Sequence, residues 1–296
     1  MGQHRLWRWQ YKTAPYLFIM PFFILFAIFS LYPFLFSFYI SLTKWNGSSN
    51  KAFIGLDNYK DLLSNREFWD SILNSIQLFV LYVPVMILLA LLFAVLLNQS
   101  WMKLKGFFRT VFFVPNIISV VAVTFVFSMM FNTHDGLINK LLMNAGWTHE
   151  AIPWLDSPWW AKLTVAFMVL YRWLGYNMLL LMAGLQNIPA DLYESAKMDG
   201  ATPAQAFWSI TVPLIRKIIA FCTILSTIGT FSLFTEPFIL TKGGPLKSTT
   251  TPVLLLYQES FQNFHFGYAS SIAVCFFFLM MTLTIVQLKL FRDDNS

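Results

Sequence analysis

Between Ser71 and Met102 the chain reads SILNSIQLFVLYVPVMILLALLFAVLLNQSWM, without one charged side chain. A helix needs about 20 predominantly apolar residues to cross a bilayer, because each residue rises about 1.5 Å and the hydrocarbon core is about 30 Å thick. Apolar and polar residues do not alternate here, as they would in a barrel strand. Since backbone polar groups in lipid need partners within the chain, the stretch predicts a membrane-spanning helix.

Five further segments have the same character, and one of them contains a single charge, Arg172. The six predicted spans are Thr13–Thr43, Ser71–Met102, Thr110–Thr133, Leu163–Leu185, Ile218–Thr235 and Phe266–Leu288. Of 296 residues, 57% are hydrophobic and 11% are charged, whereas a soluble domain has about 25% charged residues. We therefore expect an all-α polytopic membrane protein with six transmembrane helices, made of a five-helix core plus an N-terminal helix.

The first span follows Arg5, Arg8 and Lys12, as the core of a secretory signal would. Its uncharged run is longer than the roughly 7–15 residues of a signal core, and no small-x-small cleavage site follows, so we interpret it as a membrane helix. We find no internal repeat and no loop long enough for another domain. The predicted organisation is a cytoplasmic N-terminal tail over 1–12, a single transmembrane domain over 13–291 and a C-terminal tail over 292–296.

The basic residues indicate the orientation in the membrane. Six spans bring both termini to one side, and eleven Lys and Arg residues lie on that side against eight on the other. The two densest basic clusters, Arg5–Lys12 and Lys103–Arg109, are both on the side of the termini. Positive charge is enriched in cytoplasmic loops. We expect a multi-pass protein of the cell inner membrane with both termini in the cytoplasm. The net charge of +6 then indicates topology, with no nucleic acid as partner.

The loop between the fourth and fifth spans carries signals for two short helices. Asp191 is a predicted N-cap, with Glu194 three residues later as in a capping box. Gly200 suits the left-handed position that ends a helix, and Pro213 is expected to open the next span. A second helix start is marked by Thr202, Pro203 and Gln205. The apolar side chains that these helices present, typical of a protein contact, are Leu192, Tyr193, Met198, Phe207 and Trp208.

This loop resembles a cytoplasmic motif of binding-protein-dependent ABC importers. The motif is Glu-Ala-Ala, a Gly four residues after the last Ala, then nine residues and Ile-x-Leu-Pro. In that family it is the coupling helix, which docks in a groove on the ATPase subunit. The alternative is a well-capped helical hairpin without that role. The chain departs from the motif at Ser195 and Val212. The resemblance implies a coupling loop over 186–213, with ATPase-coupling residues Glu194, Ser195, Ala196, Gly200, Ile210 and Pro213.

Other stretches resemble the sugar permeases of this family, closest to the first permease of the maltose and glycerol-3-phosphate type. They are Gly55-Leu-Asp-Asn-Tyr59 with Phe68-Trp69, and Leu240-Thr-Lys-Gly-Gly-Pro245. The extra spans and large outer insertion of some maltose permeases are missing. The resemblance implies import of a sugar or oligosaccharide. It also implies as partners a second permease subunit in a heteromer, an ATPase dimer, an extracytoplasmic solute-binding protein and membrane lipid. ATP and Mg²⁺ would bind the ATPase, leaving no cofactor in this chain.

The resemblance also suggests where a solute would pass. Arg172 lies well inside a predicted span, where charge is costly and usually faces a cavity or a partner. It belongs to Tyr171-Arg-Trp-Leu-Gly-Tyr176-Asn177, similar to a substrate-lining stretch of maltose-type permeases. The candidate pathway residues are Tyr171, Arg172, Leu174, Gly175, Tyr176, Ser226, Gly229 and Thr230. Two alternatives stay open: Arg172 forms an ion pair with Glu236, and the small residues of the fifth span serve close helix packing.

Other activities have little support. The four histidines are scattered without metal-ligand spacing, and no catalytic cluster of His, Asp or Cys is present, as a membrane-embedded enzyme would need. Lys247-Ser248 lacks the glycine before lysine that a phosphate loop requires. Cys222 and Cys275 are interpreted as reduced core residues. We therefore expect a permease subunit and not an enzyme. The main alternative is a self-contained secondary transporter or channel, which would need paired acidic residues within the spans.

Overall fold

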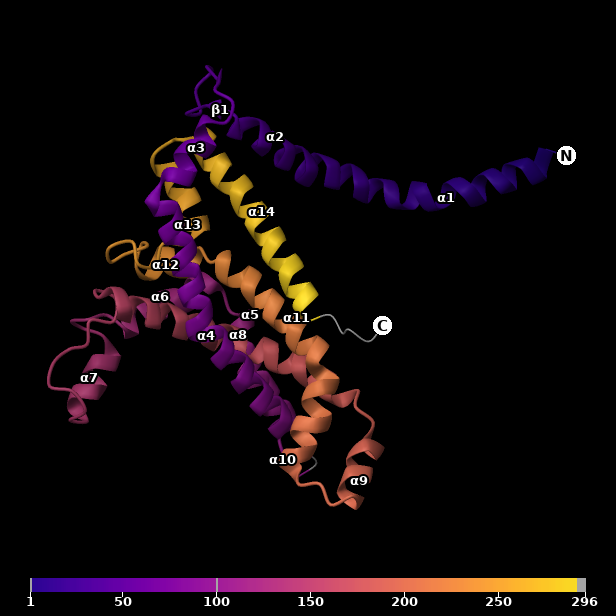
Figure 1. The fold of residues 1–296 in the computed structure, drawn as a ribbon, viewed down its shortest axis with the longest axis vertical. Helices are drawn as coiled ribbons and strands as arrows, with labels where there is room; N and C mark the ends of the chain where they lie inside the picture. Colours follow the sequence, from indigo (N-terminus) through magenta and orange to yellow (C-terminus); the bar gives the residue numbers. More distant parts are fainter. Residues whose placement is uncertain (1, 100, 292–296) are drawn as a thin grey trace. The chain divides into compact units, whose positions relative to one another are not determined.

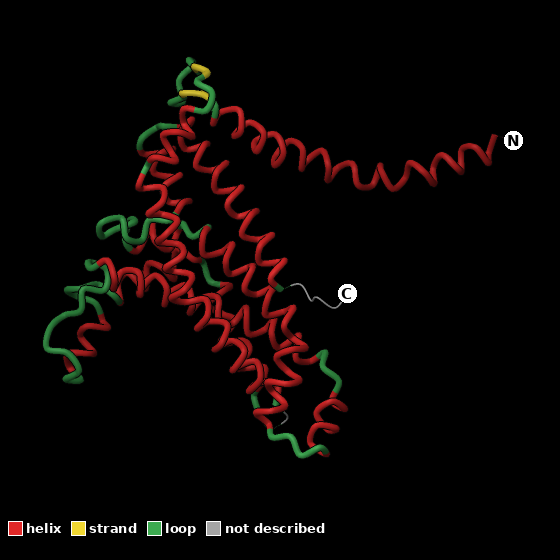
Figure 2. The backbone as a smooth tube through the Cα atoms, in the orientation of Figure 1, coloured by secondary structure: helices red, strands yellow, loops and turns green. Residues whose placement is uncertain are grey.

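The computed structural model describes residues 2–99 and 101–291, with side chains from Ala14 onward. Met1 and the predicted tail over 292–296 lie outside the described residues. Figure 1 shows the elements and Figure 2 their helical character. In chain order they are α1 (Gly2–Phe26), the π-helical turn η1 (Ala27–Leu31), α2 (Tyr32–Ser41), β1 (Thr43–Lys44), β2 (Ala52–Phe53), α3 (Asp57–Ser64), α4 (Arg66–Asn98), α5 (Lys105–Ile117), α6 (Val120–Met130), α7 (Leu137–Asn144), α8 (Pro158–Gln186), α9 (Ala190–Met198), α10 (Pro203–Ala206), η2 (Phe207–Thr211), α11 (Val212–Phe231), α12 (Thr235–Leu240), α13 (Pro252–Tyr257), η3 (Gln258–Gln262) and α14 (Phe266–Leu290).

The prediction of an all-helical membrane protein is confirmed. Within the described residues, five helices are long and apolar enough to cross a membrane, and a bent pair supplies a sixth span if it is counted as one. The five are Ala14–Ser41, Arg66–Asn98, Pro158–Gln186, Pro203–Leu240 and Phe266–Leu290. The backbone is already helical from Gly2, so the predicted N-terminal tail over 1–12 joins the first helix without a break.

The predicted span over Thr110–Thr133 is not one straight helix. It is divided between α5 and α6, which meet at an angle of 93°. Pro115 lies in the last turn of α5, where it removes a backbone donor and its ring crowds the preceding turn. Ile118 and Ser119 then adopt non-helical backbone angles before α6 begins. Proline is a common cause of sharp bends in membrane helices, and here it marks the end of the first segment.

Two other prolines are accommodated without a break. η1 and η2 each end two residues before a proline, Pro33 and Pro213. In both, the residue before the proline donates its backbone N–H to the carbonyl five residues back. The wider π-helical turn makes room for a ring that would clash in a regular helix. As a result α10, η2 and α11 form a continuous helix. The predicted second short helix is therefore the start of the fifth spanning helix, and Pro213 lies inside that helix.

The chain divides into two compact units, each described separately. The first contains residues up to Ser64 together with Leu256–Cys275. Here Asn58 donates from its amide to the backbone carbonyls of Ser41 and Thr43, at 2.8 and 2.9 Å, and the hydroxyls of Tyr59 and Ser41 are 2.6 Å apart. The Gly-Leu-Asp-Asn-Tyr stretch thus holds the end of α2 against α3 and the β1–β2 hairpin.

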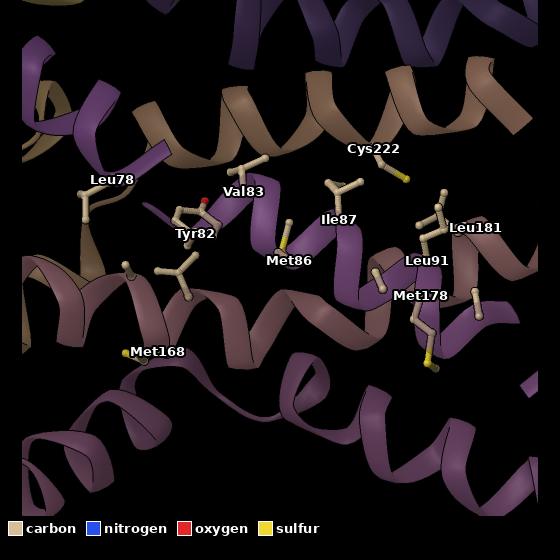
Figure 3. Packing of buried hydrophobic residues seen from close by; sticks show 14 of the residues in the cluster. Leu78, Tyr82, Val83, Met86, Ile87, Leu91, Met168, Met178, Leu181 and Cys222 are labelled. Carbon is tan, nitrogen blue, oxygen red and sulfur yellow. The ribbon is translucent and has the colours of Figure 1, made fainter. Parts of the chain in front are cut away.

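The second unit contains Asn65–Leu255 and the chain from Phe276 onward, and its core lies along α4. Figure 3 shows side chains of α4 packed between α11 and α8, among them Leu78, Tyr82 and Met86. Small residues bring these helices close, as is usual in membrane proteins. On α4, Ala90 and Ala94 are fully buried. This packing fixes the positions of α4, α8 and α11, the three helices that enclose the central cavity.

Candidate functional site

A cavity of about 260 Å³ lies between α4, α8 and α11. Its walls are mainly apolar and aromatic, with a few hydroxyl and amide groups, which is the usual composition of small-molecule sites. The lining residues are Tyr82, Met86, Trp173, Tyr176, Asn177, Leu225, Ser226, Ile228 and Gly229. Because all three helices belong to the rigid core, the cavity is shaped by elements that pack directly on one another.

Hydrogen bonds fix the polar groups at the cavity wall. The Thr230 hydroxyl donates to the backbone carbonyl of Ser226 at 2.6 Å. The Tyr82 hydroxyl lies 2.5 Å from that of Thr230 and therefore donates to it. On the facing helix, the Asn177 amide donates to the Trp173 carbonyl at 3.0 Å. These bonds hold one tyrosine ring and one amide in defined orientations against the cavity.

Arg172 forms an ion pair instead of lining this cavity. Its Nη1 lies 3.0 Å from Oε1 of Glu236 on α12, and the two side chains are only 11% and 7% exposed. Arg172 Nε is buried without a hydrogen-bond partner among the described residues. Of the two interpretations of Arg172, the ion pair is therefore the one that the structure shows. A direct contact of Arg172 with solute stays a prediction.

The other predicted pathway residues divide into two groups. Three of them line the cavity, Tyr176, Ser226 and Gly229, and Thr230 lies behind its wall. Tyr171 faces elsewhere, with its ring 5.7 Å from that of Phe127.

Leu174 and Gly175 contribute to packing. Leu174 is partly buried against the core. A Cβ at Gly175 would lie 1.9 Å from the backbone carbonyl oxygen of Phe112, so glycine is required for α8 to pack on α5 at this point.

The predicted coupling loop shows how α9 ends. Asp199 is its C-cap and Gly200 follows with φ of 81°. Ala201 N–H donates to the carbonyl of Ala196 at 2.9 Å, and Gly200 N–H donates to that of Lys197 at 3.1 Å. This pair of bonds defines a Schellman motif, in which glycine avoids the cost of a left-handed backbone. The prediction that Gly200 ends the helix is confirmed.

The two helix starts of this loop differ. Thr202 and Gln205 form a complete capping box, as predicted. The predicted N-cap at Asp191 was wrong, because Pro189 already has the extended backbone of a cap and α9 begins at Ala190. Asp191 instead lies in the first turn, where a carboxylate favours the positive end of the helix dipole.

The surface around α9 is exposed. No residue of α9 is buried in the described part of the chain. Glu194 and Ser195 are exposed, and Ala196 and Ile210 are half-buried. Large apolar side chains also face outward: Leu192 is 43%, Met198 88% and Trp208 67% exposed. Exposed apolar groups beside charged ones are characteristic of a protein-docking surface.

Comparison with known proteins identifies the family. The family described as "Binding-protein-dependent transport system inner membrane component" matches residues 62–293. The chain belongs to this family. It is thus a permease subunit of a binding-protein-dependent ABC transport system and a multi-pass protein of the inner membrane, as its spans predict.

Relatives of this permease extend over nearly its full length. It is 37% identical over 286 residues to the lactose transport system permease protein LacF of Rhizobium radiobacter, covering 96% of this chain and 95% of LacF. It is 34% identical over 290 residues to the trehalose/maltose transport system permease protein MalF of Thermococcus litoralis, covering 96% and 97%. The arabinooligosaccharides transport system permease protein AraP of Halalkalibacterium halodurans is 34% identical over 281 residues, covering 94% and 88%.

Solved structures of ABC transporters have the same fold as this permease. A bacterial ABC transporter involved in the import of the acidic polysaccharide alginate matches with a TM-score of 0.82, 21% identity and coverage of 99% of this chain and 100% of the other. The alginate transporter in complex with its pentasaccharide-bound periplasmic protein also gives a TM-score of 0.82, at 22% identity and 97% coverage of both chains. At these identities the similarity concerns the fold.

Several cavity residues of the permease were missed by sequence reasoning. They are Tyr82, Met86, Trp173, Asn177, Leu225 and Ile228. Two of them had a usable signal, because Trp173 precedes Tyr176 by three residues and Asn177 by four, spacings that share a helix face. Tyr82 lies in an apolar span, and only the need of a buried tyrosine for a hydrogen-bond partner marks it.

Proposed function

We propose that this permease forms half of the translocation pathway of an ATP-driven importer for a sugar or oligosaccharide. The relatives described above are named for lactose, arabinooligosaccharides, trehalose and maltose. The cavity chemistry supports the same class of solute. Aromatic rings such as those of Trp173 and Tyr176 stack on the C–H face of a pyranose, and the Asn177 amide and Ser226 hydroxyl suit its hydroxyl groups.

One observation carries the proposal: a single helix joins the coupling loop to the cavity. The continuous helix formed by α10, η2 and α11 begins at Pro203, directly after the Gly200 turn. It then supplies Ser226 and Gly229 to the cavity wall. About 23 residues separate Pro203 from Ser226, which is about 35 Å along a helix. A displacement of the coupling loop at one end of this helix would therefore move the residues that would contact the solute.

The proposal includes the partners that the family resemblance implies. In this proposal α9 docks on an ATPase dimer that binds ATP and Mg²⁺, with Glu194, Ser195, Ala196, Gly200, Ile210 and Pro213 as the coupling residues. A second permease subunit, in a heteromer, supplies the other half of the pathway. The cavity of about 260 Å³ lies below the roughly 300–1,000 Å³ of a typical complete ligand site, which fits a shared site. The exposed N-terminal helix is the element proposed to pack on a partner.

A solute-binding protein delivers the solute on the opposite side. A polar cavity of about 230 Å³ lies at the start of α4 and is lined by Glu67, Asn74, Lys162 and Ser248, among others. It lies at the other end of α4 from the coupling loop, about 30 residues or 45 Å away. In the proposed orientation, with both termini and α9 in the cytoplasm, this cavity faces outward. The single transmembrane domain over 13–291 carries both sites.

Transport assays test the proposal. The permease would be reconstituted in proteoliposomes with a second permease, an ATPase and a binding protein, and offered radiolabelled lactose, maltose, trehalose and arabinooligosaccharides, with histidine as a control. We expect uptake of at least one saccharide that needs both ATP and the binding protein. ATP-dependent uptake of histidine without any saccharide would overturn the proposed solute class. Uptake by this chain alone, driven by an ion gradient, would support a secondary transporter.

Cysteine labelling tests the orientation. Cys222 and Cys275 are first replaced by serine, and single cysteines are then placed at exposed Lys197 and Trp147. A membrane-impermeant maleimide is expected to label Trp147→Cys in intact spheroplasts and Lys197→Cys only after permeabilisation. The reverse pattern would place the coupling loop outside the cell and contradict the ATPase contact.

A further inference from the structure

Helix α9 is held to the rest of the permease at few points. Its side chains are exposed or half-buried throughout the described chain. Behind it lies a cavity of about 700 Å³, which is lined by α9, the ends of α4 and α8, and the start of the fifth spanning helix. Asn98, Leu185, Tyr193 and Thr211 all face this space. A helix backed by a cavity is free to change its angle, because no close-packed core resists the movement.

Among the described residues, a side-chain hydrogen bond links α9 to the fifth spanning helix. The hydroxyls of Tyr193 and Thr211 share a hydrogen bond of 2.8 Å. Tyr193 is half-buried, and Thr211 is 5% exposed. The burial of Thr211 favours the bond, because a polar hydroxyl withdrawn from water needs a partner within the protein. Thr211 is the last residue of the π-helical turn η2, directly before α11.

Together with the Gly200 turn, this bond gives α9 two attachments to the same helix. The first is at Pro203, where the capping box begins that helix. The second is at Thr211, eight residues or about 12 Å further along. Two separated attachments fix the angle between α9 and the helix, whereas the turn at Gly200 alone leaves a pivot. Without the hydroxyl pair, a force on α9 would rotate it into the cavity behind it.

We propose that the Tyr193–Thr211 hydrogen bond is a positioning contact that makes α9 and the fifth spanning helix move as one body. The inference rests on the proposed function, in which the ATPase acts on α9. Tyr193 and Thr211 are not required to touch the ATPase or the solute. They transmit the displacement of α9 to the fifth spanning helix, which also carries Ser226 and Gly229. Loss of this hydrogen bond then uncouples sugar transport from ATP hydrolysis.

The test measures both processes in the complete reconstituted transporter. Tyr193→Phe and Thr211→Val each remove one hydroxyl with little change in shape. We expect each to keep ATP hydrolysis stimulated by the loaded binding protein within about twofold of wild type. Sugar moved per ATP is expected to fall about fivefold, the size of one net hydrogen bond. The double variant is expected to be no worse than either single one, since both remove the same bond. Thr211→Ser keeps the hydroxyl and is expected to restore coupling.

A control variant matches these substitutions. Thr223→Val removes a hydroxyl from the same helix that bonds only the backbone of its own helix, to the Ile219 carbonyl at 2.8 Å. It is expected to transport as the wild type does.

The possible outcomes separate the two proposals. If the wild-type complex shows no ATP-dependent uptake, the proposed function fails and this inference fails with it. If the wild type is coupled and both Tyr193→Phe and Thr211→Val keep its ratio of sugar to ATP, the positioning contact alone is overturned. Independent effects that multiply in the double variant would also overturn it. Size-exclusion chromatography of each complex shows whether a loss of transport reflects failed assembly. If it does, the comparison of Thr211→Ser with Thr211→Val decides whether the hydroxyl is required for coupling.

Discussion

Arg172 of α8 and Glu236 of α12 form an ion pair of 3.0 Å that is almost completely buried. Charges inside a membrane protein are costly unless they are paired, and this pair connects α12, at the end of the fifth spanning helix, to α8. α12 also packs on the bent element α6. The pair therefore fixes α12 against α8, while α6 packs on the same short helix.

Breaking the Arg172–Glu236 pair is expected to destabilise the permease strongly. Removing one partner leaves an uncompensated buried charge, which costs about 3–5 kcal/mol. Arg172→Ala and Glu236→Gln should both lower the temperature at which the detergent-purified complex loses its size-exclusion peak. The double variant Arg172→Met, Glu236→Leu removes both charges and is expected to recover most of that loss. Lys60→Ala, which breaks an exposed pair with Asp57, should leave the peak unchanged.

The same variants also distinguish the two interpretations of Arg172. If the ion pair is its whole role, the stable double variant transports sugar. If Arg172 contacts solute, the double variant is stable but its uptake is lost.

Trp173 is expected to contribute directly to solute binding. An aromatic contact is worth about 0.5–1.5 kcal/mol, so Trp173→Ala should raise the half-saturating sugar concentration, measured with excess binding protein, about two- to tenfold. Trp159→Ala serves as a control, since Trp159 lies on the same helix, is 57% exposed and is not part of this cavity. Equal behaviour of the two variants would remove the cavity from the solute pathway.

Local features were predicted from the sequence more successfully than contacts between helices. The Gly200 turn and the Thr202 capping box depend on residues within one or two turns, and both are present as expected. The N-cap was misplaced by two residues because the backbone of Pro189 fixes where α9 starts. Hydropathy located the spans, since lipid permits only helices there.

The effect of each proline could not be predicted from its neighbours. Pro84 lies inside the unbroken helix α4, Pro115 precedes a 93° bend, and Pro213 follows a π-helical turn. Packing around each helix decides which response occurs. The cavity was equally hidden, because Tyr82 meets Thr230 from 148 positions away in the chain. Cavity residues within one stretch of sequence, such as Tyr176, were predicted, whereas the contribution of α4 to the cavity was not.

Gly175 is expected to be essential for stability. Its missing Cβ leaves room for the backbone of Phe112, and a methyl group there would lie 1.9 Å from the carbonyl oxygen. Backbone cannot move aside as a flexible side chain can, so Gly175→Ala should destabilise by about 1–3 kcal/mol, typical of overpacking. Gly106→Ala on α5 is the matched control, because its Cβ meets nothing within 4 Å. Thermal size-exclusion profiles in which both variants match the wild type would contradict this close approach.

Gly200 and Gly146 end their helices in the same way but at different places. Gly146 has φ of 71° and follows α7, whose last turn makes the same two bonds: Gly146 N–H to Met143 and Trp147 N–H to Leu142. A Cβ at either glycine would have no neighbour within 4 Å. A substitution at either position therefore acts through the backbone alone, which makes them a matched pair.

Gly200→Pro is expected to uncouple transport, and Gly146→Pro is not. Proline cannot adopt the positive φ and has no N–H to donate, so both variants lose the Schellman turn at similar cost. Of these two turns, only the one at Gly200 connects α9 to the fifth spanning helix. In proteoliposomes, Gly200→Pro should assemble but lose at least about tenfold of its sugar uptake per ATP hydrolysed, while Gly146→Pro should keep the wild-type ratio. Wild-type coupling in Gly200→Pro would refute the assignment of α9 as the coupling helix, because the force would then pass through another part of the permease.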